Sequence, residues 1–237
     1  MSDPVQASTE TAKAVGEVAK TTGKVVDAAR AMGGFIAKYT HGSIEQAMGI
    51  FQDKVSYARW ERQIRLMERA TKFLEERGLK EPPIPVPLKM AVPLLSAASL
   101  EDDDYMQDMW AHLLVNASVT ESSQKRAFVS MLENMSSLDA QVLNELFRVE
   151  TENGPGTAML TYDLPRLAHP VLSQQTVDPL VNPPGDVAFA LSNLARISAI
   201  TAAAVWDGGV TVAMVQMTML GRELVRACGD LKLDSAD

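Results

Sequence analysis

The chain has 237 residues, of which 46% are hydrophobic, and a formal net charge of −8. Its mean hydropathy of −0.02 excludes a polytopic membrane protein, and no apolar run approaches the roughly 20 residues that span a bilayer. Residues 1–10 lack the basic and apolar regions of a secretory signal. The single cysteine, Cys228, excludes an internal disulfide framework and a multi-cysteine zinc site. These features predict a cytoplasmic protein.

The charge is unevenly distributed along the chain. Residues 1–87 hold 13 Lys and Arg against 11 Asp and Glu, whereas residues 88–237 hold 9 against 19. An excess of ten carboxylates in the second part repels nucleic acid and anionic lipid. Only the first part is therefore expected to approach either of them.

Residues 5–38 predict a weakly amphipathic helix of small residues, interrupted by glycines that each cost about 1 kcal/mol relative to alanine. Such a helix needs a partner surface to be stable. One interpretation is a membrane-associating or self-assembling helix, because small residues let backbones approach closely. The other, which we favour, is a flexible arm that docks on its own bundle. We assign residues 1–42 to this N-terminal segment.

The longest predicted helix covers residues 43–77, from an N-cap serine to a terminating glycine, Gly78. Apolar residues recur along it every three or four positions. Its expected buried side includes Ile64, Met67, Ala70, Thr71 and Leu74.

A basic stripe follows another side of this helix. It consists of Arg59, Arg62, Arg65, Arg69 and Lys72. As a candidate contact surface, the stripe would bind a partner protein, lipid phosphates or nucleic acid. As a structural feature, it is a solvated face partly paired with glutamates of the same helix, or it docks on the acidic C-terminal half. The solvated face is the favoured interpretation.

Two short helices joined at a corner are predicted within residues 85–119. The first covers residues 87–98 with Pro93 inside it, and the second begins after Ser99 as its N-cap. Apolar doublets give the second helix a broad buried face. The acidic run 101–104 raises the question of a metal site. Consecutive carboxylates of one helical turn point in different directions, so we interpret the run as charge favoured at a helix N-terminus.

The predicted fold class is mainly α, with one long helix in an N-terminal helical bundle, followed by a small winged-helix-like α+β module. A further helix over residues 122–135 completes the bundle, which spans residues 43–136. The sequence pattern over residues 137–237 predicts a helix, a short strand, two helices, a hairpin and a last helix. This is the element order of a winged-helix module. The first helix of the module is expected over residues 138–148, the two middle helices over residues 163–169 and 186–200, and the closing helix over residues 219–228.

A winged helix that binds DNA reads the major groove with Arg, Lys, Asn or Gln side chains. The corresponding helix here offers only Asn193 and Arg196, in acidic surroundings, and the hairpin contains no Lys or Arg. The module is therefore expected to contact protein, and nucleic acid is an unlikely ligand.

The central stretch carries a family resemblance. It reads PLKMAVPLLSAASLEDDDYMQDMWAHLLVNA, preceded by YARWERQIRLMERATKFLEERG and followed near the C-terminus by MTMLGRELVRACG. This pattern, over roughly residues 44–230, resembles the Abi-alpha (abortive infection alpha) family of small bacterial proteins. Its members occur in phage-defence settings and carry a domain of unknown function. The resemblance implies a context of abortive infection, and it brings no catalytic residues.

No catalytic or cofactor-binding pattern is found. His41, His112 and His169 lie far apart in the sequence, and His112 is expected at the surface. The chain contains no phosphate-binding glycine loop, nucleophile elbow or HExxH motif. Cys228 is expected to be a buried structural thiol. We therefore predict a protein without enzymatic activity, metal or cofactor.

The predicted function is that of a non-enzymatic abortive-infection protein that acts through protein–protein contacts, including self-association. The sequence leaves open whether the N-terminal helix also contacts the inner membrane. The alternative is a winged-helix regulator associated with nucleic acid.

Overall fold

The structure is a computed structural model that describes residues 30–42, 57–171, 181–204 and 209–230. Residues 30–40 are helical. The labelled elements after them are α3 (Tyr57–Glu76), α4 (Leu88–Ala98), α5 (Asp104–Ala117), η1 (Glu121–Ser123), α6 (Arg126–Glu133), α7 (Ser137–Asn153), β1 (Met159–Leu160), β2 (His169–Pro170), α8 (Gly185–Arg196), β3 (Ile200–Ala204), β4 (Val210–Met217) and α9 (Met219–Cys228). The predicted fold class is confirmed: the chain is mainly helical, with a small antiparallel sheet in its C-terminal part.

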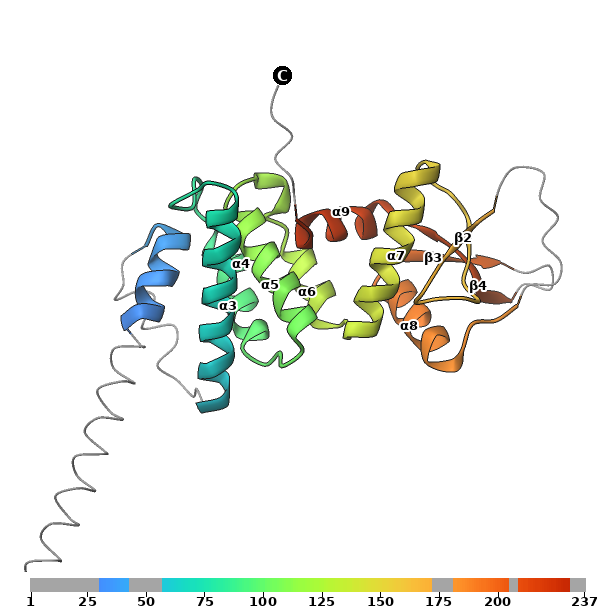
Figure 1. Cartoon of the computed structure of the whole chain (residues 1–237), viewed down its shortest axis with the longest axis horizontal. Helices are drawn as coiled ribbons and strands as arrows, with labels where there is room; N and C mark the ends of the chain where they lie inside the picture. Colours follow the sequence, from blue (N-terminus) through green and yellow to red (C-terminus); the bar gives the residue numbers. More distant parts are fainter. Residues whose placement is uncertain (1–29, 43–56, 172–180, 205–208, 231–237) are drawn as a thin grey trace, which may run out of the picture.

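Helices α3 to α6 pack at one end of the molecule and the sheet lies at the other, with α7 and α9 between them (Figure 1). One continuous cluster of buried apolar side chains runs from Met32 in the helix of residues 30–40 to Cys228 in α9. Trp110 is its largest fully buried member. Because α9 packs on both α5 and α7, buried contacts cross the predicted domain boundary at residue 136, and that boundary stays a prediction.

Helix α3 ends at Glu76, one residue before the predicted end, and the predicted glycine, Gly78, follows with a positive φ angle of 72°. Its buried face agrees with the predicted one at Ala70 and Leu74 and differs from it at the other positions. The innermost side chains are Gln63, Leu66, Ala70 and Leu74, whereas the expected apolar positions Ile64, Met67 and Thr71 are half-buried. The part of the predicted long helix over residues 43–56 lies outside the described residues.

The corner between α4 and α5 is where predicted, with Pro93 inside α4. The predicted N-cap, Ser99, is wrong. It instead follows the C-terminus of α4, where its hydroxyl donates to the carbonyl oxygen of Ser96 (2.6 Å). Asp103 caps α5 by accepting from the Met106 N–H (3.0 Å), so the helix begins four residues later than expected.

The C-terminal sheet has the strand order β2-β1-β4-β3, and all neighbouring strands are antiparallel. The predicted hairpin of β3 and β4 and the predicted closing helix α9 are confirmed. Residues 162–166 form a turn that leads into β2, so the helix predicted over residues 163–169 is wrong. The winged-helix interpretation stays a prediction, because a turn and a strand stand where its middle helix was expected.

Three further helix boundaries differ from the expected ones. Helix α6 begins at Arg126 after a short 3₁₀ turn, and α7 extends to Asn153 before Gly154 turns the chain. Helix α8 ends at Arg196, four residues earlier than predicted, since Ser198 takes a positive φ angle of 62° that redirects the chain into β3.

Candidate functional site

The basic stripe of α3 lies against the acidic N-terminal turn of α5. The Arg69 guanidinium donates to the carboxylates of Asp104 and Asp108, both at 2.6 Å. Arg62 donates to the Asp102 carboxylate and to the carbonyl oxygen of Leu100, both at 3.2 Å. Two of the candidate contact residues therefore bind carboxylates of the C-terminal half.

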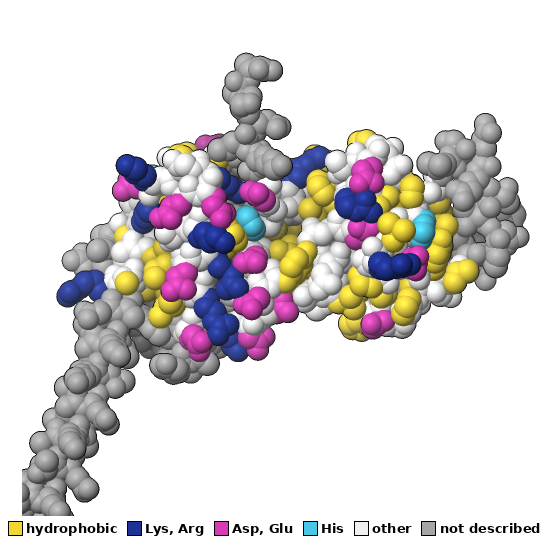
Figure 2. Space-filling view, in the orientation of Figure 1, with side chains coloured by type: hydrophobic (Ala, Val, Ile, Leu, Met, Phe, Trp, Pro, Cys, Tyr) yellow, Lys and Arg dark blue, Asp and Glu magenta, His cyan; other side chains and the backbone are white. Residues whose placement is uncertain are grey.

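The other described members of the stripe pair within α3. Arg65 contacts Glu61 (2.8 Å) and the Lys72 ammonium lies 3.7 Å from Glu76. Arg59 belongs to α3, but its side chain lies outside the described residues. Figure 2 shows the result as a band of Lys and Arg side chains with Asp and Glu on both sides. This face therefore carries both positive and negative side chains. Its role as a contact surface for a partner stays a prediction.

The acidic run 101–104 forms hydrogen bonds that stabilise the start of α5. Glu101 accepts from the backbone N–H groups of Asp102 and Asp103, and Asp103 caps α5. In the part of the chain that the structure describes, no three His, Cys, Asp or Glu side chains are placed to hold a metal ion.

A buried polar junction, which sequence reasoning missed, joins three distant segments of the chain. Arg77, with its side chain only 6% exposed, donates to the side-chain oxygen of Asn116 (2.5 Å). The Asn116 amide in turn donates to the carbonyl oxygens of Ala227 (2.8 Å) and Gly229 (2.9 Å) at the end of α9. We call these groups the Arg77–Asn116 junction. It fastens the C-terminal end of α9 to α3 and α5.

His112 lies beside this junction and is half-buried, so the predicted surface position is wrong. Its ring stacks on Phe73 with the centroids 3.9 Å apart and an interplanar angle of 6°. Burial first, and the charge of Arg77 second, lower the pKa of His112. Its Nδ1 atom and the Arg77 Nη2 atom are buried without a hydrogen-bond partner among the described residues, and Nη2 lies 3.9 Å from the Asp230 carboxylate.

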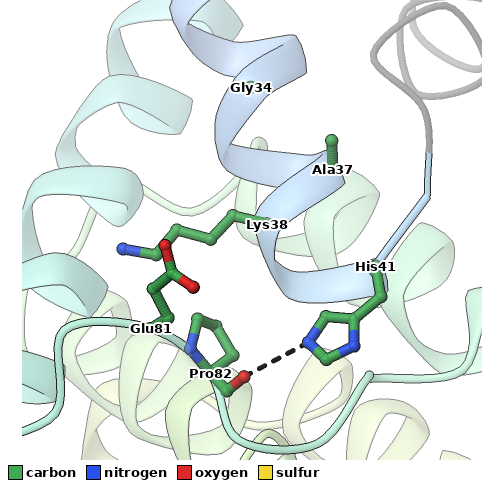
Figure 3. A pocket seen from close by; sticks show the side chains of 6 residues that line it. All are labelled: Gly34, Ala37, Lys38, His41, Glu81 and Pro82. Carbon is green, nitrogen blue, oxygen red and sulfur yellow. Dashed lines mark hydrogen bonds between the residues drawn. The ribbon is translucent and has the colours of Figure 1, made fainter.

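The other two histidines each contact one oxygen atom of the chain. His169 Nε2 lies 3.2 Å from Asp163 Oδ2, and its ring stacks on Tyr162. His41 contacts the carbonyl oxygen of Pro82 at 3.2 Å, at the edge of an open hollow of about 380 Å³ (Figure 3). The hollow is lined by Gly34, Ala37, Lys38, His41, Glu81 and Pro82. The Lys38 ammonium at this hollow donates to the carbonyl oxygen of Lys80 (2.7 Å).

Cys228 is buried on the inner side of α9, as predicted, and burial raises the pKa of its thiol. A thiol held in the protonated form is a poor nucleophile. The cysteine therefore contributes to packing.

Two polar side chains of α8, half-buried Asn193 and exposed Arg196, make hydrogen bonds within the chain. Asn193 donates to the carbonyl oxygen of Asn134 (2.8 Å) and to the Asp139 carboxylate (3.2 Å). Arg196 contacts the side-chain oxygens of Asn134 and Asn193. The solvent side of α8 instead exposes Phe189, 77% of whose surface is accessible. Helical periodicity could have placed this phenylalanine outside, since Val187, Ala190 and Leu194 define the buried side.

The fold and these contacts define a mainly helical protein with a face of paired charges on α3, an exposed Phe189 on α8 and a buried polar junction. A family model described as abortive infection alpha matches residues 61–228, so the chain belongs to this family. No curated protein and no solved structure matches it. None of the described helices combines the length and apolar content needed to cross a bilayer.

Proposed function

We propose that this protein acts in abortive infection by binding other proteins, without catalysing a reaction. Membership of the abortive infection alpha family supports the defence context. Among the described residues, the polar side chains that sequence reasoning singled out serve as caps, ion pairs or internal hydrogen bonds. This use of polar groups favours a binding protein over an enzyme.

The observation that carries the proposal is the exposed Phe189 on α8. Large aromatic side chains at a solvent-facing position are enriched in protein interfaces, where they fill a pocket of the partner. Val181, four residues before the start of α8, is also 55% exposed. A protein partner with an apolar pocket fits this surface better than a phosphate backbone does.

The nucleic-acid alternative is disfavoured by the same helix. The Asn193 and Arg196 side chains, which would have to read base edges, make hydrogen bonds within the chain. Freeing them for DNA would break the contact between α8 and the turn at Asn134. Groove reading by α8 therefore conflicts with the packing of the module.

Membrane contact is proposed as a second activity beside protein binding. It depends on residues before position 30, which lie outside the described residues. The described part of the N-terminal helix buries Met32, Phe35, Ile36 and Tyr39 in the core of the bundle. This burial agrees with the arm-like interpretation of the helix. Equal membrane fractions for the full chain and for a chain that begins at residue 30 would exclude the addition.

The test of the main proposal compares Phe189→Ser with Leu88→Ser in cells challenged with phage. Leu88 is a matched control, because it is 50% exposed on α4. We expect Phe189→Ser to lower phage protection on the order of tenfold or more, as loss of an interface anchor does. Expression level and thermal midpoint should not change, and Leu88→Ser should protect normally. Full protection by a stable Phe189→Ser variant would contradict the proposal.

A further inference from the structure

Helix α9 is held at its two ends by different kinds of contact. It begins directly after strand β4, and its last turn packs on α5 in the helical bundle (Figure 1). Near the start, the Arg222 guanidinium donates to the buried carboxylate of Glu150 on α7 (2.9 Å). At the end, the Asn116 amide donates to three backbone carbonyl oxygens within residues 226–229. The last turn of α9 therefore depends on the Arg77–Asn116 junction.

The junction is the last of three side-chain contacts that connect α3 and the residue after it to α5. The contacts join Arg69 to Asp108, Phe73 to His112, and Arg77 to Asn116. Successive contacts are four residues apart along both segments, which is about one helical turn. His112 therefore lies one turn from the junction, with its ring against Phe73.

His112 is poorly placed to carry a positive charge. Its Nδ1 atom is buried and has no hydrogen-bond partner among the described residues. The imidazolium form would therefore present a buried N–H group without an acceptor, which is unfavourable. Burial and the positive charge of Arg77 both lower the pKa of His112. The folded chain thus favours the neutral ring.

Three carboxylates act in the opposite direction on His112, and each of them already lies near another cation. The neighbouring cations are Arg69 for Asp108 (2.6 Å), Lys72 for Glu76 (3.7 Å) and Arg77 for Asp230 (3.9 Å). Asp230 has the longest of these distances, and its side chain is 72% exposed. A protonated His112 would compete with Arg77 for this loosely held carboxylate, which follows the end of α9.

We propose that His112 is a proton-sensitive switch for the end of α9: when its ring is protonated, the last turn of the helix, with Gly229 and Asp230, detaches from α5. Detachment lets water reach the imidazolium and the Arg77 guanidinium, which offsets their desolvation and weakens their repulsion. A fall of the pH below about 6 would thereby uncover the part of α5 beneath α9.

The opening is local because the start of α9 stays attached. The Arg222–Glu150 ion pair and the cap at Thr218 do not involve His112. Releasing one helix terminus costs less free energy than unfolding the whole chain. The inference adds a regulated conformational change to the molecule, and it does not depend on the proposed binding function.

The single cysteine of the chain provides the measurement. Cys228 is the last residue of α9 and only 3% exposed, so a thiol reagent reaches it when the last turn detaches. Its rate of reaction with an aromatic disulfide reagent is measured in the purified full chain and divided into the rate of the urea-unfolded chain at the same pH. This ratio, the protection of Cys228, removes the direct effect of pH on the thiol. Protection should fall about three- to tenfold from pH 7.5 to pH 5.5, the range in which an exposed histidine gains its proton.

His112→Gln should make the protection of Cys228 independent of pH, because glutamine does not titrate in this range. His169→Gln is the matched control, since His169 contacts Asp163 in the C-terminal module, and it should respond to pH as the wild type does. Hydrogen exchange of the wild type, corrected for the intrinsic effect of pH, covers the case in which His112→Gln does not fold. Amides of the last turn of α9 should lose protection at pH 5.5, whereas those of α7 keep it. Cys228 protection that does not change with pH, an equal change in His112→Gln, or equal losses of amide protection in α7 and α9 would overturn the proposal.

Discussion

A methyl group added at position 221 would lie 2.0 Å from the carbonyl oxygen of Ala199. Glycine to alanine changes inside helices normally stabilise by up to about 1 kcal/mol. Here the close approach of α9 to the start of β3 reverses the sign. We expect Gly221→Ala to lower the free energy of unfolding by about 2 kcal/mol, the usual cost of overpacking. Urea denaturation measures the change.

Gly34→Ala is the matched control for that substitution. Gly34 also lies in a helix, and nothing comes within 4 Å of a methyl group there. This variant should be neutral or more stable than the wild type. Equal behaviour of the two variants would show that the contact with Ala199 imposes no constraint.

His112 gives the chain a specific response to acid. Because its pKa lies below the ordinary value of about 6.5, the folded chain binds a proton there less tightly than the unfolded chain does. The stabilisation from neutral His112 is therefore complete above about pH 6.5 and is lost as the pH falls towards the folded-state pKa. We expect His112→Gln to lose less stability than the wild type between about pH 7.5 and pH 5.5. An unchanged difference in unfolding free energy would contradict this assignment.

At the scale of the elements, the Arg77–Asn116 junction should be expensive to break. Asn116→Ala removes the hydrogen bond that the buried Arg77 guanidinium makes among the described residues, and three hydrogen bonds to the end of α9. Unpaired buried polar groups cost about 1–3 kcal/mol each, so a loss of at least about 2 kcal/mol is expected. Asn144→Ala, which removes only a surface contact with Tyr105, is the control in the same thermal unfolding assay. Similar midpoints for the two variants would disprove the role of the junction.

The basic stripe of α3 should contribute little to nucleic-acid binding, because Arg62 and Arg69 are already paired with carboxylates. We expect no duplex DNA binding by the wild type, even at low salt where phosphate contacts are strongest. Fluorescence anisotropy checks this expectation. Binding that falls steeply with salt and that Arg62→Glu plus Arg65→Glu weakens would support the nucleic-acid regulator instead.

Capping residues and glycines in the sequence correctly predicted those helix ends that depend on neighbouring residues alone. Helix α9 has its bounds as expected because Thr218 caps it and a glycine follows its last residue. The start of α5 was predicted wrongly because two capping residues compete. Gln107 decides between them, since its amide donates to the carbonyl oxygens of Ala98 and Glu101 (both 2.9 Å) and fixes the corner before Asp103.

The buried polar groups could not be predicted in this way. The face of α3 was predicted correctly at Ala70 and Leu74 and missed at Gln63, because a search for apolar periodicity discards a buried glutamine. The partners of Asn116 lie 39 and 111 residues away in the sequence. Their proximity follows from the packing of α9 on α5, and no spacing within one helix indicates it.

At the scale of the whole molecule, the continuous core predicts that the described parts unfold together. The bundle and the C-terminal module share α9, and the buried cluster crosses residue 136. We expect one cooperative thermal transition, seen at the same temperature by circular dichroism and by tryptophan fluorescence. Two separate transitions would instead favour the independent domains predicted from the sequence.

The attachment of α9 to α5 also bears on biosynthesis. Ala227, which accepts from Asn116, is translated 111 residues after it, so the ribosome releases α5 long before its covering helix exists. Until then a nascent chain shows the apolar flank of α5 to chaperones and proteases. Messages cut short before α9 would therefore yield products that are recognised as incomplete and degraded, and only full translation would deliver the finished protein.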